Sequence, residues 1–207
     1  MNRSGKIFII AAPSGAGKTS LVNATVLELD RIQISVSYTT RPPRPGDKNK
    51  VHYHFITEAE FEKMVESHAF LEYATVYGYR YGTGQQWVSD RLQQGIDVIL
   101  EIDWQGAHQL RGQFRRAVSI FILPPSVAEL AKRLEGRQQD DSMVIQARMA
   151  KARSEMAHYD DFDYLIVNDH FDTAKAELCH IILAERLRLM EQKQEKAQLL
   201  AELLKND

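Results

Sequence analysis

The stretch of sequence that decides the fold is Ile7-Phe-Ile-Ile-Ala-Ala-Pro-Ser-Gly-Ala-Gly-Lys-Thr-Ser20. It begins with a short apolar run, turns through a segment with two glycines, and enters a helical pattern over residues 18–29. A strand, a glycine loop and a helix in this order are typical of a phosphate-binding loop. Glycines let backbone N–H groups surround an anion, and the first turn of the helix adds unpaired donors.

Two side chains at the end of this loop have the chemistry that a nucleoside triphosphate requires. Lys18 can reach the β- and γ-phosphates, and the Thr19 hydroxyl can bind Mg²⁺. The usual pattern is G-x-x-x-x-G-K-[ST], and Ala12 replaces its first glycine. This replacement is tolerable because Ala12 ends the predicted strand and need not contact phosphate. Since the flanking strand and helix are both present, we favour a phosphate-binding loop over an ordinary turn between a strand and a helix. The expected ATP-binding residues of the loop are Ala12, Pro13, Ser14, Gly15, Ala16, Gly17, Lys18, Thr19 and Ser20.

The composition is that of an ordinary globular protein with one core. The 207 residues carry 26 Lys and Arg against 28 Asp and Glu, a formal net charge of −2. This balance provides no global attraction to nucleic acid or anionic membranes, and we expect neither as a partner. No apolar run approaches the about 18 residues of a membrane-spanning helix, so we expect a cytoplasmic protein. The single cysteine, Cys179, excludes an internal disulfide and a cysteine metal site.

Alternation and apolar runs predict the other elements. Strands are expected at 32–36, 51–56, 70–77, 97–103, 117–123 and 162–168, with a turn-rich link at 78–84. Helices are expected at 57–67, 85–94, 126–134, 142–159 and 173–204. The strands near 7, 32, 97, 117 and 163 interleave with helices, which predicts an α/β three-layer fold with a central parallel sheet.

Three parts of the chain allow more than one interpretation. The proline-rich loop 37–50 presents Arg41 and Arg44, whose guanidinium groups suit a phosphate, although a solvated basic loop has the same composition. The acids Glu101 and Asp103 end a buried strand on one face, where a Mg²⁺-binding acid belongs, although strands often end in acids. A polar link flanked by arginines, within 133–159, is typical of a lid over phosphates or of a solvated helix pair.

Two further features also allow a simpler interpretation. His52 and His54 point to one face of a strand, but no third ligand lies at helpful spacing, so we favour surface histidines over a metal site. The last predicted helix has an apolar stripe formed by Leu178, Ile181, Ile182 and Leu189. Its final leucines, 199, 200, 203 and 204, could pack on the core or on a second copy of the chain, so a homo-oligomer stays open.

Motifs that cover nearly the whole chain carry a family resemblance. They are Pro13-Ser-Gly-Ala-Gly-Lys18, Ser37-Tyr-Thr-Thr-Arg-Pro-Pro-Arg-Pro-Gly46, Tyr81-Gly-Thr83, Glu101-Ile-Asp103 with Gln105-Gly106, Pro124-Pro-Ser126, Arg133-Leu-Glu-Gly-Arg137 and Val167-Asn-Asp169. Together they resemble the guanylate kinase family. The resemblance implies a P-loop NTPase core over 1–37, 95–132 and 160–207, an inserted GMP-binding lobe over 38–94 and a helical lid over 133–159. It also implies transfer of the ATP γ-phosphoryl group to GMP, and usually dGMP, with Mg²⁺.

The resemblance assigns roles to individual residues. The GMP phosphate would be held by Arg41, Arg44, Tyr53 and Tyr81. Glu72 would accept hydrogen bonds from guanine, while Ser37 and Thr83 would contact the acceptor edge of the base. Glu101 and Asp103 would complete the GMP side, and one of them would hold a water of the magnesium ion bound to Thr19. Arg137 and Arg148 would meet the ATP phosphates, Asn168 would lie near the adenine, and the catalytic cations would be Lys18, Arg41, Arg137 and Arg148.

Three departures from the family pattern are visible: Ala12 for glycine, Glu101 for the more usual aspartate and Asp47 for the usual glutamate. The implied mechanism is a direct in-line transfer without a covalent intermediate or a general base. Two alternatives are a scaffold module that binds peptides and a kinase for another phosphorylated acceptor. The intact loop argues against the first, and Glu72, Ser37 and Thr83 argue against the second.

Overall fold

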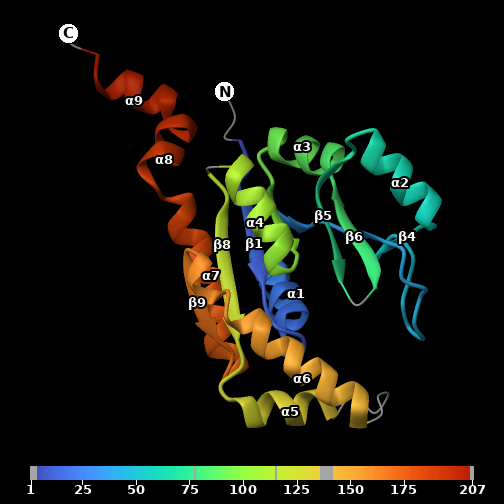
Figure 1. Cartoon of the computed structure of the whole chain (residues 1–207). Coiled ribbons are helices and arrows are strands. Elements are labelled where there is room, and N and C mark those ends of the chain that lie inside the picture. The colour runs from blue at the N-terminus through green and yellow to red at the C-terminus, as the bar shows by residue number, and fades with distance from the viewer. Residues whose placement is uncertain (1–3, 77, 115, 136–141, 206–207) are drawn as a thin grey trace.

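The computed structural model describes residues 4–76, 78–114, 116–135 and 142–205, with the side chains of 142–148 excepted. Its centre is a parallel sheet in the order β2-β7-β1-β8-β9. The strands are β1 (Ile7–Ala11), β2 (Ile32–Ile34), β7 (Asp97–Glu101), β8 (Val118–Leu123) and β9 (Tyr164–Val167). All four pairings are parallel, and helices lie on both faces of the sheet (Figure 1). The predicted three-layer α/β fold is confirmed.

Alternate residues of β1 divide the core into two layers. Phe8 and Ile10 pack with α1 (Lys18–Glu28) and α7 (Phe171–Arg186). Ile9 packs on the other face, with α3 (Gln85–Gln93) and α4 (Trp104–Gln113). Since successive side chains of a strand point to opposite faces, one uninterrupted apolar run serves both layers, and each buried side chain contributes about 2 kcal/mol. This core fixes the positions of the loops at the carboxyl ends of the strands.

A second, smaller sheet has the order β4-β3-β6-β5 and lies beside the core with α2 (Glu58–Glu66) (Figure 1). Its strands are β3 (Tyr38–Thr39), β4 (His54–Phe55), β5 (Phe70–Val76) and β6 (Tyr79–Gly84). The predicted link at 78–84 was wrong, because β6 pairs antiparallel with β5. Its glycines suit the strand: a side chain at Gly82 would collide with the Phe70 ring. The strand predicted at 51–56 is reduced to two residues, because Lys50 adopts a left-handed conformation in the preceding turn.

The helices α5 (Val127–Glu135) and α6 (Ser142–Met156) project from the carboxyl end of the sheet (Figure 1). They pack together through Leu130, Leu134 and Ala152. A short 3-10 turn, Tyr159–Asp161, then leads into β9. The helix predicted to reach 159 therefore ends earlier.

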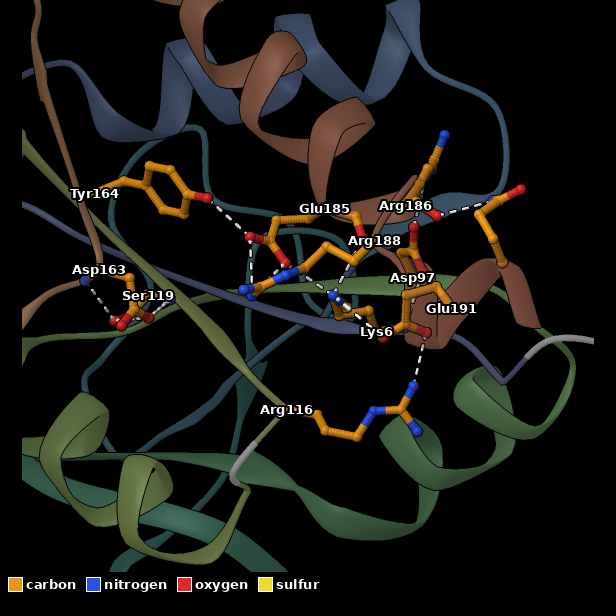
Figure 2. Close-up of polar contacts among 11 residues, drawn as sticks. Lys6, Asp97, Arg116, Ser119, Asp163, Tyr164, Glu185, Arg186, Arg188 and Glu191 are labelled. Atoms are coloured by element: carbon orange, nitrogen blue, oxygen red, sulfur yellow. Dashed lines mark hydrogen bonds and ion pairs between the residues drawn. The ribbon is translucent and has the colours of Figure 1, made fainter. Parts of the chain in front are cut away.

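An ionic cluster closes the opposite end of the sheet (Figure 2). The Lys6 ammonium group lies 2.9 Å from Glu185 and 3.3 Å from Glu191, and all three side chains are about 5 % exposed. Arg116 pairs with Glu191 at 2.7 Å. Nearby, Arg186 pairs with buried Asp97 at 2.8 Å. Buried charges need such partners because desolvation costs several kcal/mol per ion, and the cluster ties β1 to the end of α7.

The same cluster explains why the single helix predicted over 173–204 was wrong. The chain forms α7, then α8 (Leu189–Glu195) and α9 (Ala197–Leu203). Arg188 is extended, with φ −55° and ψ 140°, and this bend brings Glu191 back to Lys6. Leu189 leaves the predicted apolar stripe and is 68 % exposed. Figure 1 shows α8 and α9 extending away from the sheet. In the described part of the chain, no helix is long and apolar enough to cross a membrane.

Candidate active site

The loop between β1 and α1 has the backbone geometry that its glycines predict. Gly15 and Gly17 have φ of 92° and 89°, a region that other residues rarely adopt. A side chain at Gly17 would also collide with Asn168, whose amide donates to the Ala16 carbonyl at 2.7 Å. Asn168 is buried and braces the loop from β9, and its predicted place near an adenine stays a prediction. Because α1 begins at Lys18, the loop lies at a helix N-terminus, which favours anions.

The loop meets the carboxyl end of β7, the strand beside β1. The Thr19 hydroxyl donates to Glu101 at 2.9 Å, and the Lys18 ammonium group donates to the Ile102 carbonyl at 3.1 Å. Burial lowers the pKa of Lys18, and nearby carboxylates, first Glu101 and then Asp103, oppose this shift. The Lys18 side chain is thus desolvated, and it lines the same cavity as the loop.

Glu101 and Asp103 have different surroundings. Asp103 caps α4: it accepts from the Gly106 N–H at 3.0 Å and from the Gln105 amide at 2.9 Å. Glu101 instead contacts Thr19. A hydroxyl beside a carboxylate fits Mg²⁺, which takes one or two protein oxygens and fills its other positions with phosphate and water. Among the described residues, no three or more His, Cys, Asp and Glu side chains gather to enclose a metal by themselves.

Glu72 places a buried carboxyl group in the same region. It is 4 % exposed, and the Thr83 hydroxyl donates to it at 2.5 Å. Burial raises the pKa of Glu72 to about 7, against the opposing hydrogen bond from Thr83. A side chain at Gly106 would collide with the Glu72 carboxylate, so this glycine makes room for it. The arrangement supplies two acceptor oxygens with little competing water.

The proline-rich loop holds its first arginine firmly. The Arg41 guanidinium group pairs with Asp47 at 2.9 Å, donates to the Pro42 carbonyl at 2.8 Å and lies 5.4 Å from the centre of the Tyr53 ring. Asp47 also accepts the Arg44 N–H at 2.8 Å. Burial acts to raise the pKa of Asp47, but the hydrogen bonds from Arg44 and Arg41 outweigh it and hold the pKa below its ordinary value.

One cavity of about 480 Å³ unites most of the predicted site residues. From the predicted set it is lined by Ala12, Pro13, Ser14, Gly15, Gly17, Lys18, Thr19, Ser20, Ser37, Arg44, Tyr53, Glu72, Tyr81, Glu101 and Asp103. Ala16, Arg41, Thr83 and Asn168 are buried behind these residues and support them. Arg137 lies outside the described residues, and of Arg148 only the place in α6 is described.

The sequence interpretation missed Glu155, which also lines the cavity. It is 7 % exposed, and its carboxylate accepts the Ser14 N–H at 3.4 Å. The helical spacing could have indicated that Glu155 is buried. It follows Ala152 by three positions, so both lie on the side of α6 that packs inward. Glu155 is the one acid in the sequence of α6, and composition alone does not distinguish it from a solvated side chain.

Neither His52 nor His54 belongs to a group of possible metal ligands in the described part of the chain. His54 stacks on Tyr38, with ring centres 4.4 Å apart. His52 accepts the Lys48 N–H at 3.1 Å and is exposed. Both side chains have a structural explanation.

Comparisons with known proteins agree with this geometry. The family model described as guanylate kinase matches residues 4–185. A guanylate kinase of Coxiella burnetii is 57 % identical over 204 residues, which cover 99 % of this chain and 98 % of the relative. One of Saccharophagus degradans is 53 % identical, covering 99 % and 100 %. The crystal structure of guanylate kinase from Anaplasma phagocytophilum aligns with a TM-score of 0.82 at 29 % identity, covering 100 % of this chain and 99 % of that one. The chain therefore belongs to the guanylate kinase family.

Proposed function

We propose that this chain transfers the γ-phosphoryl group of ATP to GMP, and also to dGMP, with release of ADP and GDP. The observation that carries the proposal is the single cavity lined by the phosphate loop on one side and by the buried Glu72 on the other. Both nucleotides would therefore bind along one shared cavity. ATP and GMP are cytoplasmic metabolites, which supports the expected cytoplasmic location.

The acceptor side suits guanine because of what Glu72 can accept. Guanine offers N1–H and a 2-amino group, whereas adenine has neither and would leave a buried carboxylate unpaired. Thr83 orients the carboxylate by its hydrogen bond of 2.5 Å, and Ser37 lines the same cavity. Arg41, Arg44, Tyr53 and Tyr81 form the phosphate end of this site. Arg41 would keep its aromatic contacts while its outer edge bonds phosphate oxygens.

The donor side consists of the phosphate loop and the end of β7. Loop N–H groups and Lys18 would hold the ATP phosphates. Thr19 and Glu101 would hold Mg²⁺, Glu101 through a water, and the ion would neutralise phosphate charge when bound. Asp103 is less suited to this role because it caps α4. Arg137 and Arg148 stay proposed lid residues, on the sequence alone.

The reaction needs cations more than it needs acid–base chemistry. An oxygen of the ionised GMP phosphate attacks the γ-phosphorus in line, and ADP leaves on the opposite side. Two anions must approach each other, so Lys18 and the arginines lower the barrier by placing positive charge where negative charge gathers. The lobe over 38–94 and the lid over 133–159 would align the substrates as they close on the core.

The test is a coupled assay of ADP release with ATP and Mg²⁺ and, in turn, GMP, dGMP, AMP, CMP and UMP. We expect turnover with the guanine nucleotides and its loss in Lys18→Ala. The exposed Lys193→Ala serves as a matched control that keeps full activity. A folded protein with no turnover on any monophosphate would reject the proposal and direct the search to another phosphorylated acceptor or to a peptide.

Self-association stays a prediction. Leu199, Leu203 and Leu204 are 50 %, 70 % and 77 % exposed, so α9 has an apolar face that the described core does not cover. Light scattering of the whole chain over a concentration series would show whether a second copy covers it.

A further inference from the structure

The last turn of α6 inserts a carboxylate into the phosphate loop. Glu155 lies in the wall of the active-site cavity, and its Oε2 accepts the Ser14 N–H at 3.4 Å. Its Oε1 lies 3.8 Å from the Lys151 ammonium group, one turn earlier. Both contacts are longer than strong charged hydrogen bonds, so the carboxylate is enclosed but weakly held.

This position is one that a phosphate oxygen would need. The loop directs backbone N–H groups at an anion, and Ser14 lies inside it, two residues after Ala12. Burial raises the pKa of Glu155, and Lys151 and the Ser14 N–H only partly offset that effect. The acid also faces Asp103 and Lys18 across the site, so a polyphosphate arriving there would meet a second negative charge.

We propose that Glu155 is a positioning residue that occupies a phosphate-oxygen position of the phosphate loop and that ATP must displace. Displacement moves the end of α6, so the lid helix senses whether the donor site is full. The inference rests on the proposed function only in taking ATP as the donor. It assigns Glu155 no contact with the reacting atoms.

Two contacts connect the end of α6 to its surroundings, one within the lid and one to the core. Ala152, on the same helix, packs with Leu130 and Leu134 of α5, which also close over Gly15 of the loop. Beyond the helix, His158 stacks on Trp104, with ring centres 3.7 Å apart and an interplanar angle of 9°. Trp104 begins α4 directly after Asp103. A shift of the end of α6 therefore changes the surroundings of a natural fluorophore.

The first experiment measures ATP binding by calorimetry, with Mg²⁺ and no acceptor, on the whole chain. Glu155→Gln keeps the shape and an acceptor oxygen but removes the charge, and Glu155→Ala removes both. We expect both variants to bind ATP about tenfold more tightly than the parent, the size of effect that one nearby charge produces in a partly hydrated site. GMP binding should change less than twofold, and Glu177→Gln on the exposed face of α7 should change neither.

Two results of this experiment would overturn the proposal, and they differ from each other. Unchanged ATP affinity in Glu155→Gln would overturn the proposal. Weaker ATP binding in Glu155→Ala with no gain in Glu155→Gln would identify a brace that holds the loop in shape, and would also overturn it. Glu155→Asp keeps the charge and shortens the reach, so it should bind ATP like the parent or up to threefold more tightly. Thermal melts confirm that each variant is folded.

The second experiment tests the transmission to α6. The chain has two tryptophans, so Trp87→Phe leaves Trp104 as the only one. We expect ATP to change the Trp104 emission in this background. Glu155→Gln should reduce that change by at least half, because in this variant the end of α6 is already detached from the phosphate loop. An equal change with and without the Glu155 carboxylate would contradict the transmission. Neither experiment needs turnover, so an enzyme that fails to phosphorylate GMP would still yield interpretable binding data.

Discussion

Buried acids at the two ends of the central sheet have pKa values shifted in opposite directions. At the amino end, Glu185 and Glu191 surround Lys6, and hydrogen bonds outweigh burial to hold the pKa of both acids below the ordinary value. Around the phosphate loop, burial raises the pKa of Glu72 and Glu155. In the described part of the chain no ion pair reaches Glu72, whose neighbour is the Thr83 hydroxyl.

The difference separates acids whose ion pairs hold the fold from acids that a ligand would bind or displace. A paired buried ion has already recovered part of its desolvation cost, so changing its partner should affect stability. Glu72, which no ion pair reaches in the described structure, lowers stability, and the free protein carries that cost until a ligand with matching donors arrives. Substitutions at the two ends should therefore have effects of different kinds.

Glu72→Gln should produce the largest effect, and on activity. The amide offers one acceptor where guanine presents two donors, and its own N–H group would face a guanine donor. We expect kcat/KM for GMP to fall about 10³-fold, within the range seen when a site built for hydrogen bonds loses them. Steady-state kinetics with GMP and AMP would measure it, with the exposed Glu66→Gln in the same lobe as a control. An unchanged preference for GMP over AMP would show that Glu72 does not read the base.

Lys6→Met should affect stability and leave kcat/KM within about twofold. It leaves two buried acids without their shared cation, and breaking a buried pair costs about 3–5 kcal/mol. Because the folded-state pKa values of Glu185 and Glu191 are depressed, their stabilisation is present above about pH 4.5 and is lost as the pH falls through the folded values. The difference in the free energy of unfolding between the variant and the parent should therefore become smaller below about pH 4.5.

Urea unfolding at pH 7.5 and pH 4 measures this deficit. Lys132→Met, at an exposed position of α5 whose side chain is 82 % exposed, is the control and should change stability by about 0.5 kcal/mol or less. A deficit independent of pH would mean that Lys6 acts through packing of its alkyl chain.

Without a nucleotide, burial of Glu72 should lower the free energy of unfolding as the pH rises. Its folded-state pKa of about 7 lies above the value of 4.5 for an ordinary glutamate. The folded chain thus holds the proton more tightly, and the stability from this group is fully present below pH 4.5 and lost as the pH rises through 7. Glu72→Gln removes this loss, so the variant should gain up to about 3 kcal/mol over the parent between pH 5 and pH 8.5. Urea unfolding of both proteins over this range, without nucleotide, tests it, and parallel pH profiles would contradict it.

The sequence predicted the core well because its signals are local. The apolar run of β1, the two loop glycines and the acids at the end of β7 carry their structural meaning within a few residues. The family resemblance then added Glu72 and Thr83, which are eleven residues apart on paired strands. No local pattern shows that these two side chains meet.

The errors came from contacts between distant segments. The helical pattern continues past Arg188, but the chain bends there so that Glu191 reaches Lys6, 185 residues away in sequence. The glycines of β6 are typical of a link, yet pairing with β5 makes them a strand. Glu155 resembles a surface acid until α6 packs on α5. Tertiary contacts outweighed local propensity in each case.

The smallest predicted effect concerns Asp47. This acid forms an ion pair, like the acids that hold the fold, but it lies beside the proposed GMP site, like the acids that a ligand would bind or displace. It holds Arg41 at 2.9 Å and fixes the Arg44 N–H at 2.8 Å. Asp47→Asn keeps an acceptor but weakens the bond to Arg41, whose other contacts are the Pro42 carbonyl and two aromatic rings. We expect KM for GMP to rise about fivefold with kcat unchanged, the value of one weakened charged hydrogen bond at a partly exposed site. Asp47→Glu, the more usual residue of the family, should stay within twofold. A lower KM in Asp47→Asn would show that Asp47 competes with the GMP phosphate for Arg41, and would move this acid from the group that holds the fold to the group that a ligand displaces.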